Sequence, residues 1–249
     1  MKIGVVPFLN ARPLIWKLDE KHQIVYLPPS EMSQALQKGQ VDASLCPIID
    51  HYCYPEFPII PVSVIATQGD VRSVRVLSNR SLDMIERLFA DSNSKTSVNL
   101  TKLILKKFYG IKKLEIRSTP IYSFRPDQMK SWEAVLQIGD IALSSAPFGI
   151  TVTDLGREWV RLIQKPFVFA VWLAKNADIS KQLNQDLYEA KANGLQHIDD
   201  IVSNYKGFWR YETPKLKEYL EKNISFDYGD QETQAISIFE QLLREEKIL

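Results

Sequence analysis

The first fifty residues alternate between short apolar runs and helix-forming segments, and this alternation restricts the fold more than any other feature of the chain. Ile3–Val6, Ile24–Leu27 and Val41–Cys46 are apolar runs of strand length. A short helix is expected at Asn10–Pro13, and the segment Pro28–Gly39 has the proline start and glycine stop of a second helix. Strands that alternate with helices in this way predict an α/β sheet with parallel connections.

The middle of the chain predicts a change of lobe. Ile60–Ala66 and Ser73–Leu77 are β-rich runs on either side of Gln68-Gly69-Asp70, which predicts an antiparallel hairpin with a Gly-Asp turn. A new α/β unit follows, and the long apolar run Pro166–Trp172 would return the chain to its first part. We therefore expect an α/β protein of two lobes with a ligand cleft between them. The expected lobes are residues 1–85 with 172–249, and residues 86–171.

The charge balance and the hydropathy exclude several classes of protein. Lys and Arg total 31 against 30 Asp and Glu, and the formal net charge is +1. Nucleic-acid binders usually carry a marked basic excess, so we expect no nucleic-acid partner. No segment approaches the roughly 20 apolar residues of a membrane helix. The first residues also lack the features of a secretory signal, and we expect a cytoplasmic protein with no membrane partner.

Sequence motifs for metals and cofactors are absent. His22, His51 and His197 lie far apart and show no zinc-ligand spacing, and Cys46 and Cys53 form no C-x-x-C motif. The sequence also lacks a G-x-G-x-x-G loop, a P-loop lysine and a G-x-S-x-G elbow. We expect a site that uses neither a metal nor a cofactor.

The polar segment Ser94-Lys95-Thr96-Ser97 is the first candidate for ligand binding. It precedes a helix that runs to about Tyr109, so free backbone N–H groups and the positive end of the helix dipole favour a carboxylate or a phosphate there. Lys95 adds a positive charge, and the hydroxyl groups add donors. The alternative is ordinary N-capping of the helix without a ligand.

Three further polar side chains follow predicted strands and are candidates for chemistry. Asn10 follows the first strand, and its amide both donates and accepts hydrogen bonds. Ser78 ends the second run of the predicted hairpin, near the lobe junction. Asp140 follows the buried run Ala134–Ile138 and is a candidate acid or base. Each of these residue types is also common in turns that bind no ligand, and that alternative stays open.

Five stretches resemble the chorismate dehydratases of the futalosine route to menaquinone, and they occur in the order that this family shows. They are Ile3–Leu14 (IGVVPFLNARPL), Gly39–Pro47 (GQVDASLCP), Asp91–Ser97 (DSNSKTS), Ile138–Leu143 (IGDIAL), and Asp154–Trp159 (DLGREW) leading to Pro166–Trp172 (PFVFAVW). The likeness covers nearly the whole chain and is weakest beyond about residue 175.

The resemblance implies a fold like that of type II periplasmic binding proteins, with each lobe a mixed sheet flanked by helices. It implies a carbon–oxygen lyase that removes water from chorismate, a small anionic substrate. By the same likeness Asn10 and Ser78 are the functional polar pair, while Arg12 and the segment Ser94–Ser97 bind substrate. Lys95 departs from the family, which usually has Arg there, and a lysine lacks the planar bidentate fork of a guanidinium.

Two other functions remain open at this stage. One is a binding protein that holds a small carboxylate without chemistry, because the same fold serves both purposes. The other is the related 1,4-dihydroxy-6-naphthoate synthase of the same pathway, although Phe8-Leu-Asn-Ala-Arg-Pro13 favours the dehydratase. The base that takes the ring proton is either Asp140 or a carboxylate of the substrate. The sequence gives no indication of the oligomeric state.

Overall fold

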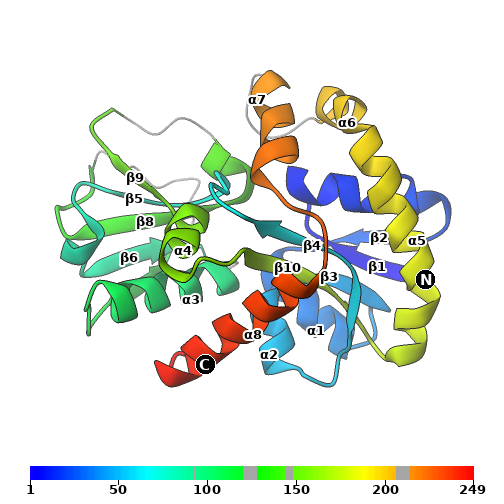
Figure 1. The fold of residues 1–249 in the computed structure, drawn as a ribbon, viewed down its shortest axis with the longest axis horizontal. Helices are drawn as coiled ribbons and strands as arrows, with labels where there is room; N and C mark the ends of the chain where they lie inside the picture. Colours follow the sequence, from blue (N-terminus) through cyan, green and yellow to red (C-terminus); the bar gives the residue numbers. More distant parts are fainter. Residues whose placement is uncertain (92–93, 120–127, 144–147, 206–212) are drawn as a thin grey trace.

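The computed structural model describes residues 1–91, 94–119, 128–143, 148–205 and 213–249, whose strands form two five-stranded sheets (Figure 1). The strand order is β2-β1-β3-β10-β4 in the first sheet and β7-β6-β8-β5-β9 in the second. Each sheet with its helices is called a lobe below. Both sheets are mixed, as predicted, and the lobes lie next to each other in Figure 1.

The first lobe begins with the parallel strands that the alternating pattern predicts. β1 pairs in parallel with both β2 and β3, whereas β10 is antiparallel to β3 and β4. Every residue of β3 is buried, as expected for a strand covered on both faces. The strands are β1 (Lys2–Val5), β2 (Gln23–Tyr26), β3 (Ala43–Pro47), β4 (Ile59–Thr67) and β10 (Phe167–Ala174). The helical segments are η1 (Leu9–Ile15), η2 (Leu18–Glu20), η3 (Pro29–Glu31), α1 (Met32–Gln37), α2 (Ile48–Cys53), α5 (Ala177–Gln196) and α6 (Ile198–Asn204).

The second lobe is built from one continuous part of the chain. Its central strands β6 and β8 are parallel to each other, while β5 runs antiparallel to both β8 and β9. The strands are β5 (Val74–Ser78), β6 (Arg87–Ala90), β7 (Glu115–Ser118), β8 (Glu133–Ile138) and β9 (Thr151–Asp154). The helical segments are η4 (Leu82–Met84), α3 (Lys95–Leu103), the π-helical η5 (Ile104–Phe108), η8 (Gly139–Leu143) and α4 (Leu155–Ile163).

The predicted hairpin over residues 60–78 is wrong, because its two strands belong to different sheets. β4 pairs with β10, and β5 pairs with β8 and β9. The chain therefore leaves the first sheet within residues 68–73 and rejoins it at β10. The predicted lobe limits, residues 1–85 with 172–249 and residues 86–171, stay a prediction. From the strand pairing we propose that the chain crosses between the lobes at residues 68–73 and 164–166.

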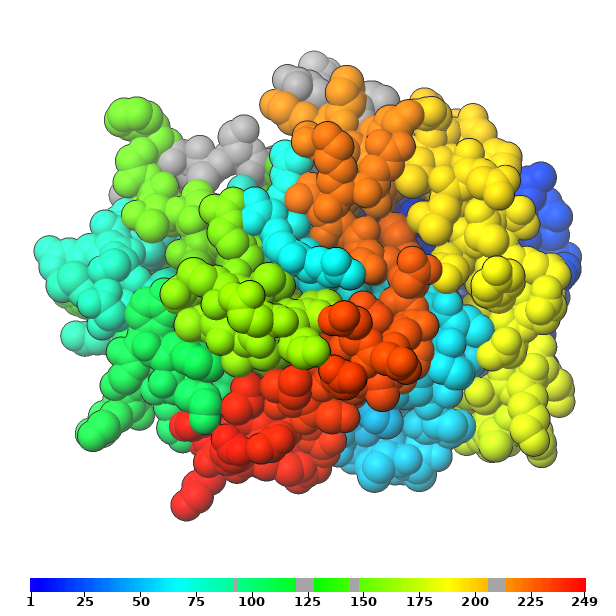
Figure 2. Space-filling model, in the orientation of Figure 1, coloured from blue at the N-terminus to red at the C-terminus, as the bar shows by residue number. Residues whose placement is uncertain are grey.

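The C-terminal helix joins the two lobes along one side of the molecule. After α7 (Thr213–Glu218) and the π-helical η9 (Tyr219–Asn223), α8 (Asp230–Glu245) runs to near the end of the chain. Phe239 of α8 makes edge-on ring contacts with Tyr52 of α2 in the first lobe and Trp159 of α4 in the second. Figure 2 shows this orange-red segment against both the green and the light-blue surface. Burial of these rings holds the two lobes against one helix.

Candidate functional site

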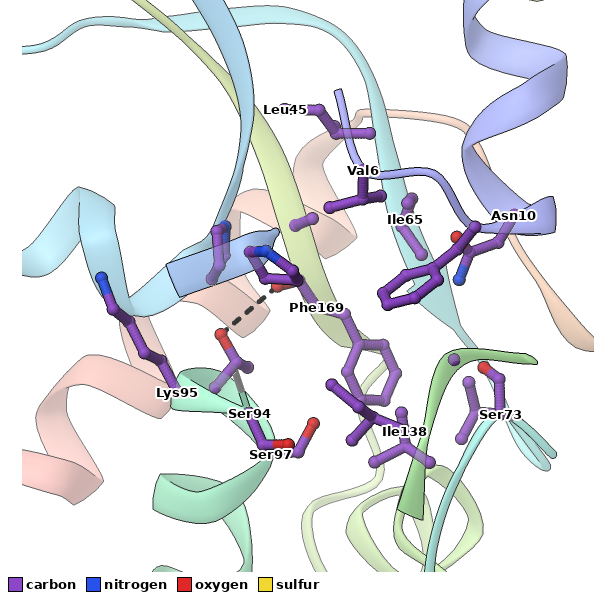
Figure 3. A pocket seen from close by; sticks show the side chains of 18 residues that line it. Val6, Asn10, Leu45, Ile65, Ser73, Ser94, Lys95, Ser97, Ile138 and Phe169 are labelled. Carbon is purple, nitrogen blue, oxygen red and sulfur yellow. Dashed lines mark hydrogen bonds between the residues drawn. The ribbon is translucent and has the colours of Figure 1, made fainter. Parts of the chain in front are cut away.

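A cavity lies between the lobes, where the carboxyl ends of β1, β3, β4, β6 and β8 meet (Figure 3). Its centre is apolar; the lining there includes Val6, Leu45, Ile65, Ile138 and Phe169. The cavity volume is about 90 Å³. Because one water needs roughly 10–15 Å³ on the same scale, the space suits several waters or one molecule about the size of a ring.

Asn10 and Ser73 form one polar end of the cavity (Figure 3). Asn10 lies in η1, directly after β1, and its Nδ2 donates to the hydroxyl of Tyr219 at 3.1 Å. Its Oδ1 is buried without a hydrogen-bond partner among the described residues. A buried acceptor left open in this way is costly unless a ligand fills it, so Asn10 is well placed to accept from a ligand hydroxyl.

Ser78 lies outside the cavity, although the sequence predicted that it would join Asn10 and Lys95 there. Its hydroxyl donates to the carbonyl of Arg80 at 2.6 Å. Strand direction explains the difference: β5 is antiparallel to β8, so Val74 pairs with Ile138 at the cavity while Ser78 pairs with Ala134 at the far end. The serine at the start of the strand, Ser73, therefore lies at the cavity.

The start of α3 forms the other polar end (Figure 3). Ser94 is only 2% exposed, and its Oγ has no hydrogen-bond partner in the described part of the chain. Thr96 and Ser97 also line the cavity, and Thr96 makes a long bond of 3.5 Å to the carbonyl of Phe169. Unpaired hydroxyl and backbone N–H groups at the positive end of a helix suit a carboxylate.

Lys95 lines the cavity with its stem, but its ammonium group is bound elsewhere. Nζ lies 2.9 Å from Oδ1 of Asp50 in α2 and 3.5 Å from Oγ of Ser33. Figure 3 shows the side chain extending away from the Asn10 end of the cavity. Burial raises the pKa of Asp50, and the bond to Lys95 opposes that rise. Lys95, which is predicted to bind substrate, thus forms an ion pair that joins α3 of one lobe to α2 of the other.

Arg12, which is also predicted to bind substrate, is not among the described residues that line the cavity. Its guanidinium donates to the hydroxyl of Tyr26 at 2.7 Å. The same group lies 5.0 Å from the ring centre of Tyr26 and 5.9 Å from that of Tyr205. Arg12 therefore lies close to the rings of both Tyr26 and Tyr205.

Asp140 contacts the opposite lobe instead of the cavity. It accepts the backbone N–H of Leu9 at 3.2 Å and a hydrogen bond from the hydroxyl of Tyr205. Burial raises the pKa of its carboxyl group, and these bonds partly offset the rise. Beside it, Gly139 has a positive φ of 63° and packs under the ring of Phe8. Asp140 and Gly139 thus hold the two lobes together at the Asn10 side.

Sequence reasoning missed three residues of this site. Ser73 begins the second run of the predicted hairpin, Asp50 lies inside a short helix, and Tyr219 lies in a helical segment far along the chain. Single residues of these types carry no local signal, because only tertiary contacts bring Ser73 to the cavity, Asp50 to Lys95 and Tyr219 to Asn10. The described residues contain no group of three or more His, Cys, Asp or Glu that is able to hold a metal ion. Among them, too, no helix has the length and hydropathy needed to cross a membrane.

Comparison with known proteins identifies the family. A family model described as menaquinone biosynthesis matches residues 1–245. The chain belongs to the menaquinone biosynthesis family. A relative from Thermus thermophilus, named chorismate dehydratase, is 28% identical to this family member over 223 residues, which cover 80% of this chain and 79% of the relative. The relation to menaquinone biosynthesis that the five sequence stretches predicted is confirmed.

Solved structures confirm the fold of this menaquinone biosynthesis family member. A protein from Archaeoglobus fulgidus matches with a TM-score of 0.81 at 10% identity, over 100% of this chain and 98% of the other. The periplasmic aliphatic sulphonate binding protein of Escherichia coli matches with a TM-score of 0.66 at 13% identity, over 100% and 92%. The fold is that of type II periplasmic binding proteins, as predicted.

Proposed function

We propose that this protein is a chorismate dehydratase, which removes water from chorismate to give 3-[(1-carboxyvinyl)oxy]benzoate. The family membership and the name of the T. thermophilus relative support this choice. The structural observation that carries it is the division of one small cavity into two polar ends around an apolar centre. Chorismate has the same division, with carboxylates and a hydroxyl on a six-membered ring.

The cavity suggests how the substrate lies. A carboxylate accepts hydrogen bonds at the start of α3, where Ser94 has an unpaired hydroxyl. The ring packs against Phe169 and Ile138, and the ring hydroxyl lies between Asn10 and Ser73. This arrangement binds the anion with neutral donors and the helix dipole, since Lys95 is committed to Asp50.

The reaction needs one proton acceptor and one donor. A ring C–H bond breaks, its electrons form the new ring double bond, and the neighbouring C–O bond breaks to release hydroxide, which leaves as water after protonation. Ser73 and Asn10 hold the departing hydroxyl. Asp140 is not among the described residues that line the cavity, and in this proposal a carboxylate of the substrate takes the ring proton and returns it to the departing hydroxide. Because the product gains a benzene ring, orientation and help to the leaving group are sufficient.

The test is incubation of the purified protein with chorismate, followed by chromatography for the aromatic enol-ether acid. Asn10→Ala and Ser73→Ala are expected to lower kcat by roughly 10²-fold, the scale of a lost acid–base or leaving-group contact. Ser78→Ala is the matched control, because its hydroxyl is buried outside the cavity and bonds to Arg80. Near wild-type turnover in both cavity variants would contradict the assignment.

A non-catalytic carboxylate-binding protein is the second candidate, because structural relatives include a periplasmic sulphonate binding protein. The same experiment separates the two. Chorismate that stays unchanged but raises the melting temperature would favour the binding protein.

A further inference from the structure

The first turn of η1 has no capping group from its own end. η1 begins at Leu9, directly after Phe8, whose apolar side chain caps no N–H group. The first N–H groups of a helix have no carbonyl partner within that helix. The N–H of Ala11 donates to the carbonyl of Phe8 at 3.2 Å, which closes the turn and leaves the N–H of Leu9 outside it. An acceptor for Leu9 must therefore come from another part of the chain.

Asp140 of the opposite lobe supplies that acceptor. Its Oδ1 accepts the N–H of Leu9 at 3.2 Å, from a residue 131 positions away in the chain. Its Oδ2 accepts from the hydroxyl of Tyr205, which lies at the C-terminal end of α6. Two donors of the first lobe thus hold one carboxylate of the second, and bonds to a charged acceptor are stronger than neutral ones. This contact exists only while the lobes are together.

The bond to Leu9 bears on Asn10, because Asn10 is the next residue of the same turn. Nδ2 of Asn10 is held by the hydroxyl of Tyr219 at 3.1 Å, and Oδ1 is buried without a partner among the described residues. The direction of Oδ1 therefore depends on where the backbone of η1 lies. A displacement of about 1 Å in a group that contacts the substrate is able to cost about 10²-fold in rate.

The residues beside this bond are walls of the cavity. Phe8 and Gly139 both line it, whereas Asp140 is not among the described residues that do. Gly139 has a positive φ, and an added Cβ would lie 3.0 Å from the ring of Phe8. The bond between Leu9 and Asp140 therefore joins the two lobes next to the place where their walls meet most closely.

We propose that Asp140 is a positioning residue, which caps η1 from the opposite lobe and thereby holds Asn10 in the direction that the ligand hydroxyl requires. The inference rests on the proposed function, because there Asn10 holds the departing hydroxyl. It also ties assembly of the site to closure of the lobes, since Leu9 loses its acceptor when the lobes separate. Asp140 takes no proton from the substrate in this role and acts through a backbone N–H.

The kinetic test compares Asp140→Ala with Asp140→Asn. The asparagine keeps an oxygen for the N–H of Leu9, and the hydroxyl of Tyr205 is able to accept from its amide, whereas alanine removes the acceptor. We expect kcat to fall about tenfold in Asp140→Ala, the scale of one lost helix cap, and to stay within about threefold of wild type in Asp140→Asn. A residue that takes the ring proton would fail in both variants. A loss in Asp140→Asn as large as in Asp140→Ala, or wild-type kcat in Asp140→Ala, would overturn the proposal.

Asp42→Ala is the matched control. Asp42 also accepts a backbone N–H through its carboxylate, that of Lys2 at 2.8 Å, but both residues belong to the first lobe and neither is among the described residues that line the cavity. This variant is expected to melt at a lower temperature and to keep kcat per folded molecule. If its kcat falls as far as that of Asp140→Ala, a general loss of structure explains both and the proposal is wrong.

Coupling to Asn10 tests the route of the effect. In an Asn10→Ala background the side chain that Asp140 positions is already gone, so the further loss from Asp140→Ala is expected to shrink to less than about twofold. A loss that stays tenfold in this background would show that Asp140 acts on some other group.

A measurement without substrate separates this inference from the proposed function. In the free protein, NMR-detected hydrogen exchange of the Leu9 amide should be about tenfold faster in Asp140→Ala than in wild type, and close to wild type in Asp140→Asn and Asp42→Ala. Equal exchange in wild type and Asp140→Ala would contradict the cap. Absence of chorismate turnover in the wild type would count against the dehydratase and leave this readout intact. If Asp140→Ala cannot be purified, kcat of Asp140→Asn decides, because a loss of a hundredfold or more there overturns the proposal and near wild-type turnover supports it.

Discussion

Replacing Lys95 with methionine removes the ammonium group that faces Asp50 and keeps a side chain of similar length. The carboxylate of Asp50 is 2% exposed, and Lys95 is its hydrogen-bonded cation at 2.9 Å. The pair joins α3 of the second lobe to α2 of the first. The variant therefore leaves a buried carboxylate without a cation at the contact between the lobes.

The expected loss of stability follows from the burial of the two partners. Breaking a fully buried pair by removing one partner costs about 3–5 kcal/mol. Lys95 is 33% exposed, so water already screens part of the interaction. We expect a loss of roughly 2–3 kcal/mol at pH 8, or a melting temperature about 5–10 °C lower for a chain of this size.

The loss should depend on pH because Asp50 titrates. Burial raises the folded-state pKa of Asp50 above its ordinary value, and Lys95 opposes that rise, so removal of Lys95 raises the pKa further. A carboxyl group with a raised folded pKa becomes less destabilising as pH falls through that pKa, and the penalty is gone below the unfolded pKa. The variant is therefore expected to lie closest to wild type at low pH and furthest from it at pH 8.

The assay is thermal unfolding of both proteins between pH 5 and pH 8. Lys107→Met is the control, because Lys107 forms a partly exposed pair with Glu245 of α8 at 3.2 Å. This variant is expected to lose less than about 1 kcal/mol of unfolding free energy. If the melting temperature of Lys95→Met falls below that of wild type by the same amount at pH 5 and pH 8, or by more at pH 5, the reasoning is refuted.

Three further substitutions test other contacts. Gly194→Ala would bring a Cβ within 2.0 Å of the carbonyl oxygen of Pro13, so we expect about 3 kcal/mol of destabilisation by denaturant unfolding. At Gly139 the backbone has a positive φ, and an added Cβ would contact the ring of Phe8. Gly139→Ala should therefore lower the free energy of unfolding by about 1–2 kcal/mol and raise KM for chorismate. Ser94→Ala removes a buried unpaired hydroxyl, so the free protein should melt no lower than wild type while KM rises about tenfold.

The parts of the fold that the sequence predicts are those set by local pattern. The parallel arrangement of β1, β2 and β3 follows from three apolar runs with helices between them, and the glycine stop at Gly39 has a positive φ. β9 gives no such signal, because it is a short polar strand at the edge of its sheet. The wrongly predicted hairpin also shows the limit of local pattern. β4 and β5 lie on either side of a turn-like segment, and only their pairing with the distant strands β10 and β8 places them in different sheets.

For the site, the sequence predicts the segments better than the side chains. Asn10 and Ser94 lie at the cavity because they follow strands whose carboxyl ends meet there. The same rule fails for Ser78, since β5 runs in the opposite direction to its neighbour β8. The charge on Lys95 suggested an anion ligand, but the partner is Asp50, which no spacing along the chain relates to it.

The place of β10 between β3 and β4 also determines the order in which the protein can form during synthesis. β4 ends at Thr67 and β10 begins at Phe167, whereas the strands of the second sheet all fall between Val74 and Asp154. A ribosome therefore releases a complete second sheet while the first still has a gap at its centre, with two unpaired edges. Closing that gap is a late, long-range event, and the same strand delivers Phe169 to the cavity.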